Sequence, residues 1–521
     1  MKEILWTVLP GLLIAAPALS QEIRRLPEAM IRQLWEDAEP PRSELSQGRP
    51  ELPMRRRTVV TAGLPQAAAR AVGPTLASRP GFEYDVRFTN PACSLVRYPR
   101  QVPSRDPRGT PLAAKPQGAY CRSGEPIGRE ITPRPKDKLL QWIGEPTTRE
   151  IFFTYLSFRE RDVVRALCSA LSRGVRLTFF IDKGVPGDDG SPAVPDVASA
   201  NEVVRCARTP GQVRFELRGH EGGIDFSHNK IMLINPGEVN PREATPRETR
   251  IVFSSANLTS GLTTHHENWN FIKTDTHSHF ARTHVCVMQA MIGHTRSAQD
   301  YSSFLNRCVA EIRAPEEVDM RAFFTPASGD RAADELVDGI RRSREIWMAA
   351  HRFSFNEMLD ALRARIATQP RPDIRLIADD DLHWTGLGDR QGVPADDERE
   401  ITRIPNMPFE ASAVAGLMAE SQRRGGGMET RYVETNQLEF QLQHNKFLIF
   451  DSDSVFTGAG NLTGAAFRSN LENYYVVSIP SIVAKYREQH QRMWNTLSSL
   501  KDPTRTPGPP RPFLPAANHR L

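Results

Sequence analysis

The sequence predicts an α/β protein with two similar lobes, because one pattern of elements and one short motif each occur twice. The pattern is a strand, a helix and a second strand, beginning at Glu150 and again at Ile346. The motif is a His, one spacer and a Lys followed by apolar residues, and it begins at His228 and at His444. At 521 residues the chain is also too long for one ordinary domain.

The first copy of the pattern can be followed residue by residue. Glu150–Tyr155 is mostly apolar and predicts a buried strand. Arg159–Ser172 has apolar residues at helical spacing, and Gly174 is typical of a helix end. Val175–Ile181 predicts a second strand, which ends at Asp182. A strand, a helix and a strand in this order indicate a parallel α/β unit.

The second copy aligns with the first without gaps over its strand and helix. Ile151–Leu167 corresponds to Ile346–Leu362, and the strand that follows ends at Asp182 in one copy and at Asp381 in the other. Asp379-Asp380-Asp381 resembles a metal cluster, but the alignment favours the end of a buried strand. A duplication of this length indicates two domains, since solenoid repeats are shorter.

The rest of the chain divides by composition. The predicted parts are a signal peptide at 1–20, a Pro/Arg-rich N-terminal extension at 21–130, lobes at 131–315 and 316–500, and a Pro-rich tail at 501–521. Lys2, an apolar stretch from Ile4 to Ala18 and small residues before Gln21 are typical of an export signal; an uncleaved anchor is the alternative. A short helix is expected at Pro27–Asp37, and residues 385–430 predict an inserted loop over the site.

The six cysteines agree with export. An even number after an export signal predicts up to three disulfides, and sequential pairing is the simplest arrangement: Cys93 with Cys121, Cys168 with Cys206 and Cys286 with Cys308. None has CxxC spacing, which argues against a zinc cluster. The net charge of +5 is a mild basic excess that does not by itself imply a nucleic-acid partner.

The flanks of the repeated motif match as well. Ser254-Ser255-Ala256-Asn257 and then Glu267-Asn268 follow the first copy, and Gly458-Ala459-Gly460-Asn461 and then Glu472-Asn473 follow the second. Alternate side chains of a strand share a face, so each His and Lys should point together into a common cleft. A Lys can hold a phosphate oxygen while the imidazole transfers a proton or attacks phosphorus. We interpret the two copies as two halves of one active site, each with a His, a Lys, an Asn and a Glu.

This constellation resembles the phospholipase D superfamily, which is named for its HxKxxxxD motif. The resemblance covers about residues 135–500, and the second repeat carries the full motif at His444, Lys446 and Asp451. The first repeat has His228 and Lys230 but Asn235 in place of the final Asp. If that Asp is mainly structural in the family, activity survives the change, and this is the outcome we expect. If its charge balances Lys230, the first half is weakened.

The resemblance implies two pseudo-twofold-related α/β/α lobes, with the active site between them, and a covalent mechanism without metal or cofactor. His228 is the expected nucleophile and His444 the expected general acid and base. The predicted catalytic residues are His228, Lys230, Glu267, His444, Lys446, Asp451 and Glu472, and Ser255, Asn257 and Asn461 are expected to bind the substrate. Each Glu should orient an imidazole, while His265 and His266 are expected to be surface histidines.

The expected function is that of an exported phospholipase D-like phosphodiesterase acting on phospholipid head groups. The protein should be a secreted or periplasmic monomer that touches a membrane surface transiently. Three alternatives remain open. They are a secreted nuclease, which would make nucleic acid the substrate, a cardiolipin-synthase-like phosphatidyltransferase, and a non-catalytic phosphate-binding protein.

Overall fold

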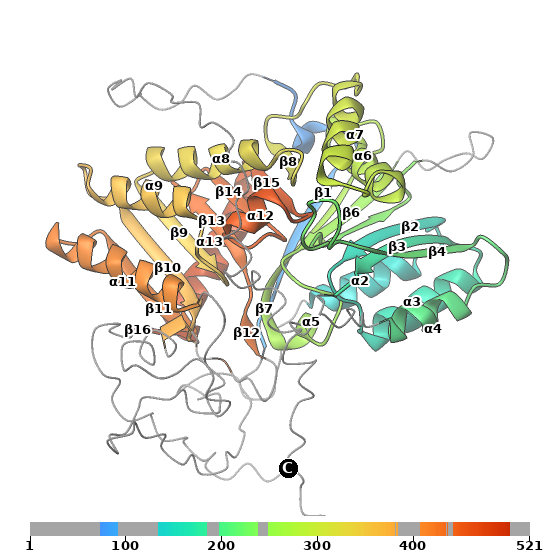
Figure 1. Ribbon diagram of the computed structural model, residues 1–521, viewed down its shortest axis with the longest axis horizontal. Coiled ribbons are helices and arrows are strands. Elements are labelled where there is room, and N and C mark those ends of the chain that lie inside the picture. The colour runs from blue at the N-terminus through green and yellow to red at the C-terminus, as the bar shows by residue number, and fades with distance from the viewer. Residues whose placement is uncertain are drawn as a thin grey trace, which may run out of the picture. The chain divides into compact units, whose positions relative to one another are not determined.

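The computed structural model describes residues 73–91, 134–184, 197–237, 248–380, 382–383, 407–433, 435 and 441–500. All of them belong to one compact unit, Ala38–Leu521 (Figure 1). The export signal, the helix expected at Pro27–Asp37, the Cys93–Cys121 pair and the 501–521 tail lie outside the described residues. Within the described part of the chain, no helix is both long and apolar enough to span a bilayer.

The chain forms the same series of elements twice. The first series comprises β1 (Glu83–Thr89), α2 (Pro135–Gly144), β2 (Glu150–Tyr155), α3 (Arg161–Ser172), β3 (Arg176–Asp182), α4 (Ala198–Arg205), β4 (Val213–Arg218), β5 (Ile231–Ile234), β6 (Glu248–Ser254), α5 (Gly261–Thr264), β7 (His265–Asp275), α6 (His279–Gly293) and α7 (Ala298–Ala310), with a 3-10 turn, η2 (Leu76–Ser78), before β1. The second comprises β8 (Met320–Phe324), α8 (Gly329–Arg342), β9 (Glu345–Ala350), α9 (Asn356–Ile366), β10 (Asp373–Asp379), α11 (Met407–Arg423), β11 (Met428–Val433), β12 (Leu442–Gln443), β13 (Lys446–Phe450), β14 (Ser454–Gly458), α12 (Gly464–Arg468), β15 (Asn473–Val477), α13 (Pro480–Arg492), η4 (Met493–Leu497) and β16 (Ser498–Leu500).

The two sheets have equivalent strand orders. The first is β1-β7-β6-β5-β2-β3-β4, and the second is β8-β15-β14-β13-β9-β10-β11 with β16 added at its edge. In both sheets the strand–helix–strand unit is parallel, as predicted, and the strands that carry the motif run antiparallel to it. The equivalence also shows that β1, from the stretch expected to be an N-terminal extension, is the counterpart of β8 and opens the first series.

Side chains on the two faces of the first sheet pack into two different cores. Phe152 and Phe180 point to one side of the first sheet, while Phe153 and Phe179 point to the other. One core lies between the first sheet and α2, α3 and α4, which cover the outer face of this lobe in Figure 1. The other contains α6, α7 and α13 and side chains from both sheets, so the two lobes share a continuous apolar core.

The structure corrects the alignment of the strands that follow the repeated helices. β2 pairs with β3 so that Ile151 lies opposite Leu177, and β9 pairs with β10 so that Ile346 lies opposite Ile374. This register makes Asp379 the counterpart of Asp182, where the sequence alignment gives Asp381. The connection after the helix is two residues longer in the second repeat. A shift of two residues preserves the alternation of inward and outward side chains, so the apolar pattern could not reveal it.

The prediction of a loop at residues 385–430 is wrong for the part of this segment that the structure describes, residues 407–430. Residues 407–423 form α11, which stands between β10 and β11 as α4 stands between β3 and β4. Its sequence, with Ala411, Ala413, Leu417 and Ala419, is rich in good helix formers. Gly425, Gly426 and Gly427 all have positive φ and connect the helix to β11.

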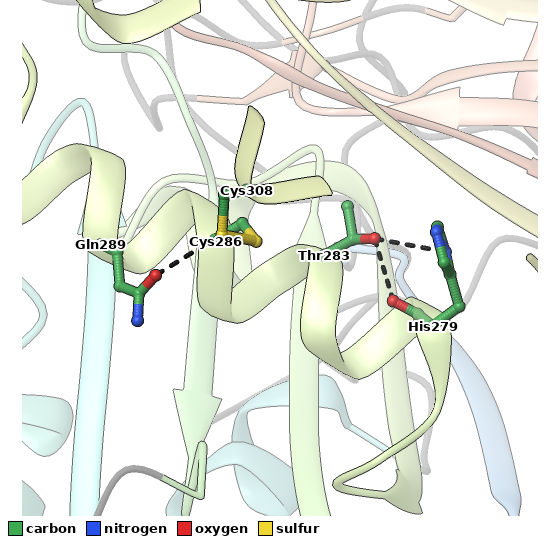
Figure 2. Close-up of a disulfide and its surroundings, with 5 residues drawn as sticks. All are labelled: His279, Thr283, Cys286, Gln289 and Cys308. Carbon is green, nitrogen blue, oxygen red and sulfur yellow. Dashed lines mark hydrogen bonds between the residues drawn. A yellow bond between two sulfur atoms is a disulfide. The ribbon is translucent and has the colours of Figure 1, made fainter. Parts of the chain in front are cut away.

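Two of the predicted disulfides are present. Cys168–Cys206 links α3 to the end of α4, and Cys286–Cys308 links α6 to α7 (Figure 2). Both bridges close short segments within the first repeat. The second repeat contains no cysteine, so packing, hydrogen bonds and ion pairs such as the buried Arg352–Glu410 hold its described residues.

Candidate active site

The two His-x-Lys segments lie at the beginning of equivalent strands. His228 and Lys230 immediately precede β5, while His444 precedes β13, whose first residue is Lys446. All four residues are buried, with no more than 2% of any of them exposed. The motif therefore lies at the start of a strand in both repeats, whereas the sequence analysis placed each His and Lys on the strand itself.

The imidazole of His228 is held at both nitrogens. Its Nδ1 lies 2.6 Å from Oε2 of Glu472, and its Nε2 lies 2.8 Å from Nζ of Lys230. A carboxylate can only accept a hydrogen bond and an ammonium can only donate one. These partners assign the proton to Nδ1 and leave the Nε2 lone pair as the acceptor. In this tautomer Nε2 is the atom that can attack or take up a proton.

The imidazole of His444 is also held through Nδ1. This atom lies 2.7 Å from Oε1 of Glu267, while Nζ of Lys446 donates to the main-chain oxygen of His444 at 3.1 Å. Burial would raise the pKa of Glu267. The charge of His444, hydrogen bonds from His265 and His444 and the charge of Lys446 outweigh burial and lower that pKa to about 2. Glu267 therefore stays ionised at neutral pH and remains an acceptor for Nδ1.

Each glutamate binds the histidine of the other repeat. The sequence predicts two half-sites that each contain their own His and Glu, and this assignment of the glutamates is wrong. Ser227 pairs in parallel with Leu471, and β12 pairs in parallel with β7. The main-chain N–H of each His donates to the residue just before the opposite glutamate, at 2.9 and 3.0 Å. The two imidazole–carboxylate pairs therefore cross between the lobes.

The asparagine after each glutamate repeats this exchange. Oδ1 of Asn473 accepts a hydrogen bond from the main-chain N–H of Lys230 at 2.9 Å, and Oδ1 of Asn268 accepts one from Lys446 at 3.3 Å. Both asparagines are fully buried. The asparagine of each Glu-Asn pair thus holds the backbone of the His-x-Lys segment in the opposite repeat.

The two carboxylates have different additional partners. Ser255, expected to bind substrate, is instead fully buried and donates its hydroxyl proton to Oε2 of Glu267 at 2.5 Å. Ala459 holds the equivalent position in the other repeat and has no hydroxyl. Oε1 of Glu472 accepts a hydrogen bond from Nδ2 of Asn470 at 3.1 Å. The role of Ser255 is therefore to orient a carboxylate.

Asp451 lies at the opposite end of its strand from His444. It follows Lys446 by five positions along β13, which is roughly 16 Å of extended chain. Its Oδ1 accepts hydrogen bonds from the main-chain N–H groups of Arg344 and Glu345, at 2.7 and 2.8 Å. These groups lie at the start of β9. Asp451 therefore does not belong with the catalytic side chains as predicted: it ties the end of β13 to the start of the neighbouring strand, β9.

Asn235 performs the same task in the first repeat. Its Oδ1 accepts from the main-chain N–H groups of Arg149 and Glu150, at 2.8 and 3.3 Å, and its Nδ2 donates to Thr147 O at 3.0 Å. Asn235 and Asp451 both adopt positive φ, 54° and 48°, which Asn and Asp tolerate better than most residues. The substitution of Asn for Asp therefore removes no charge from the site of the histidines.

Asn257 and Asn461 occupy equivalent loops after β6 and β14. The leucine that follows each of them forms an isolated parallel bridge with the segment after β2 or β9, Leu258 with Phe158 and Leu462 with Phe353. Oδ1 of Asn257 is buried and has no hydrogen-bond partner among the described residues. Contact with the substrate remains a prediction for both asparagines.

Three histidines near the site were missed or misplaced by the sequence analysis. His265 and His266, expected at the surface, are 8% and 6% exposed. Nδ1 of His265 lies 3.3 Å from Oε1 of Glu267, and its ring centroid is 5.5 Å from that of His444. The ring of His351, at the end of β9, is 4.7 Å from that of His444. The useful signal was the two-residue spacing of His265 and Glu267, which places both on one face of β7.

The aspartates that end β3 and β10 support the approach to the motif. Oδ2 of Asp182 accepts from the main-chain N–H of Ser227, and Oδ2 of Asp379 accepts from that of Gln443, both at 2.7 Å. Ser227 and Gln443 each immediately precede a motif histidine. Asp379 and Asp380 also bind Thr435, so among the described residues this acidic stretch has a structural role, as the sequence favoured.

One group of side chains in the described part of the chain has the composition of a metal site. It consists of His265, Glu267 and His444, whose possible ligand atoms all lie within 4.8 Å of one another. The sequence analysis did not anticipate it, because it expected no metal ligands and placed His265 at the surface.

Comparison with known proteins agrees with this geometry. A sequence model described as "Cardiolipin synthase, PLD-like domain" matches residues 139–290 and 336–494, more than half of the chain. The chain belongs to the phospholipase D superfamily. Its two matched segments fall in the two repeats and include both His-x-Lys motifs.

The individual proteins that the chain resembles match it over shorter segments or at low sequence identity. The chain is 32% identical over 71 residues to the mitochondrial cardiolipin hydrolase of Xenopus laevis; the match covers 14% of this chain and 32% of that protein. Phosphatidylserine synthase of Haemophilus influenzae Rd KW20 superposes with a TM-score of 0.50 at 11% identity, covering 70% of this chain and 85% of the synthase. Nuc of Salmonella typhimurium, a phospholipase D family member, matches 35% of this chain and 98% of its own at 20% identity and a TM-score of 0.25. The synthase supports the two-lobed α/β fold.

Proposed function

We propose that this phospholipase D superfamily member hydrolyses phosphodiester bonds of phospholipid head groups through a phosphohistidine intermediate. The observation that carries the proposal is the crossed pair of imidazoles, each held through Nδ1 by a buried glutamate. Because a carboxylate occupies Nδ1, Nε2 is the working atom of each ring. In the first half, the lysine ammonium bound to Nε2 of His228 stands where a phosphate oxygen would be attracted.

The reaction would proceed in two steps. Nε2 of His228 attacks phosphorus and forms an N–P bond, the bond to the leaving alcohol breaks, and protonated His444 gives its Nε2 proton to the leaving oxygen. Water then gives a proton to His444 and attacks phosphorus, and the N–P bond breaks. Lys230 and Lys446, with Asn257 and Asn461, would stabilise charge on the phosphorane oxygens. Each step balances without a further reactant.

A lipid is favoured over other phosphodiesters by the names of the similar proteins. The family description, the Xenopus relative and the structural neighbour from Haemophilus all refer to phospholipid enzymes. Two of these names are of synthases, so transfer of the phosphatidyl group to an alcohol is the second candidate. It differs from hydrolysis only in that an alcohol takes the place of water in the second step.

The experiment offers the purified protein vesicles of phosphatidylcholine or cardiolipin, with and without a primary alcohol, and separately plasmid and single-stranded DNA. Release of head group with formation of phosphatidic acid supports hydrolysis, and an excess of phosphatidyl alcohol supports transfer. Degraded DNA with untouched lipid would overturn the lipid assignment in favour of a nuclease. Turnover should persist after treatment with EDTA, because no step requires a metal.

We also propose that the protein is an exported monomer. The apolar stretch before Gln21 and the two described disulfides support export, since such bridges persist in oxidising compartments. Transient contact with a membrane surface would follow from a lipid substrate. Secretion is tested by locating the protein in culture medium and periplasm and determining its N-terminal residue, which should be Gln21; gel filtration with light scattering tests the monomer.

A further inference from the structure

The two crossed carboxylates differ in the number of imidazoles that they bind. Oε1 of Glu267 lies 2.7 Å from Nδ1 of His444 and 3.3 Å from Nδ1 of His265. At the equivalent place in the other half, Glu472 binds His228 and the amide of Asn470. Two imidazole nitrogens and one carboxylate therefore converge in one half only.

This triad has suitable chemistry and spacing for a zinc ion. Imidazole and carboxylate are zinc ligands with bonds of about 2.0–2.2 Å, so tetrahedral ligand atoms lie about 3.3 Å apart. The separation of His265 Nδ1 from Glu267 Oε1 already has this value, and all the ligand atoms lie within 4.8 Å of one another. A small rotation of the His444 ring, or of the Glu267 carboxylate, would open the shorter contact. The fourth position would be left to water.

Neighbouring residues hold the triad in place. The ring of His265 packs against Gly261, where an added Cβ would lie only 2.6 Å from Nδ1. The hydroxyl of Ser255 fixes Oε2 of Glu267, as a supporting partner does at metal centres. His265 and Glu267 are separated by two positions on β7, and a strand fixes the direction of both side chains.

We propose that His265, Glu267 and His444 form a Zn²⁺ site that inhibits the enzyme. Zinc binding itself does not depend on phosphodiesterase activity, whereas the inhibition rests on the proposed function. The other half-site lacks this property because Asn470 stands in place of His265, and an amide is a poor zinc ligand. Mg²⁺ and Ca²⁺, which prefer oxygen ligands, would not bind.

The inhibition follows from the tautomer of His444. Zn²⁺ takes the Nδ1 lone pair, so the proton on Nδ1 of a neutral ring must move to Nε2. With Nε2 protonated and Nδ1 bonded to the metal, the ring has no lone pair with which to accept a proton from water. The ammonium of Lys446, whose Nζ lies 3.1 Å from the main-chain oxygen of His444, would repel the cation. We therefore expect a reversible site of micromolar affinity, weaker than a structural zinc centre.

The first test measures binding alone. The full-length protein is stripped with EDTA, desalted and titrated calorimetrically with Zn²⁺, and His265→Asn copies Asn470 into the other half. We expect one equivalent bound by the wild type, and affinity weakened roughly tenfold or more in His265→Asn. His277→Asn, at an exposed histidine that follows β7, is the matched control and should bind as the wild type does. Equal binding by the wild type and His265→Asn would overturn the proposal.

A second measurement does not depend on a variant that folds. Crystals of the wild-type protein soaked in Zn²⁺ should show an anomalous scattering peak between His265, Glu267 and His444, and a peak elsewhere only would contradict the site.

In the activity assay, Zn²⁺ should inhibit the wild type and His277→Asn at the concentration at which it binds, and inhibit His265→Asn much less relative to its own zinc-free rate. If the protein binds Zn²⁺ at the triad but cleaves no phosphodiester, the metal site stands and the proposed function fails.

Discussion

The two halves of the site differ at a position that the motif displays and at others, outside the motif, that lie beside the carboxylates. The visible difference, Asn235 against Asp451, lies at the far end of a strand, where both side chains hold two main-chain N–H groups. The hidden differences are His265 against Asn470 and Ser255 against Ala459. His265, Ser255 and Asn470 bind the carboxylates that hold the motif histidines. Departure from a family motif is therefore a poor measure of chemical divergence unless the place of the residue in the fold is known.

The largest expected effect is on catalysis, from the loss of either motif histidine. His228→Ala and His444→Ala should each reduce turnover at least about a thousandfold, since His228 forms the N–P bond and both steps become slow without proton transfer by His444. The measurement is the release of head group from phospholipid vesicles, with thermal unfolding as the control for folding. If the halves divide the chemistry as proposed, labelled phosphohistidine should be trapped in His444→Ala but never in His228→Ala. A rate like that of the wild type in either variant would refute a shared site.

The crossing of the glutamates can be tested separately. Glu472→Gln and Glu267→Gln should each lower turnover by roughly a hundredfold or more, because the amide can present a donor to Nδ1 and favour the wrong tautomer. NMR of isotope-labelled imidazoles should show that Glu472→Gln alters the titration of His228 and leaves that of His444 nearly unchanged. Glu267→Gln should do the reverse. A response within the same repeat would show that the glutamates do not cross.

The free energy of unfolding should depend on pH through His284, which lies at the contact between the two halves. This residue of α6 is buried, and its Nδ1 donates to the main-chain oxygen of Phe280 at 2.8 Å. Its Nε2 therefore accepts from the hydroxyl of Tyr475 of β15 at 3.0 Å, and burial lowers its pKa from 6.5 to about 4. The unfolded chain therefore takes up this proton first as the pH falls. The stability contributed by the neutral ring is complete above about pH 6.5 and is lost towards pH 4, by on the order of 3 kcal/mol.

Urea unfolding at pH 7 and pH 4.5 measures this loss in the wild type and in His284→Gln. The variant should be less stable at pH 7 and should show a smaller decrease on acidification. Other buried histidines, such as His490, also have a lowered pKa, so some dependence will persist in the variant. An identical dependence in both proteins would exclude His284 as a contributor.

The smallest effect is expected at the visible difference between the motifs. Asn235→Asp loses the hydrogen bond from Nδ2 to Thr147 and should cost about 1 kcal/mol of stability. Asp451→Asn keeps both accepted hydrogen bonds and should cost less. Both variants should retain turnover within about twofold of the wild type, since these residues are far from the histidines. A large gain of activity in Asn235→Asp would show that the missing charge belongs to the chemistry.

Local patterns predicted the elements well and their partners poorly. The strand at Glu150–Tyr155 and the helix ending at Ser172 follow from apolar spacing and appear where expected. The helix at Met407–Arg423 was missed because the glycines after it suggested a loop, although its own residues favour a helix. The register of β10 was misassigned by two residues, because the alternation of side chains is unchanged by such a shift.

The same limit applies to the site. The spacing of His228 and Lys230 determines that they share a face, so this pair was predictable from the chain alone. The partner of His228 was not, since Glu472 is 244 residues away and is brought close by the parallel pairing of Ser227 with Leu471. The burial of His265 likewise depends on contacts from the other repeat. Sequence patterns identify the residues of the site, and tertiary pairing decides which of them act together.

The crossed carboxylates also determine when the chain can first become active. His228 is synthesised long before Glu472, so an incomplete chain that emerges from the ribosome carries this imidazole without the group that sets its tautomer. Neither repeat can assemble a working imidazole–carboxylate pair by itself. The site would thus be complete only after almost the whole chain has been made and both halves have docked.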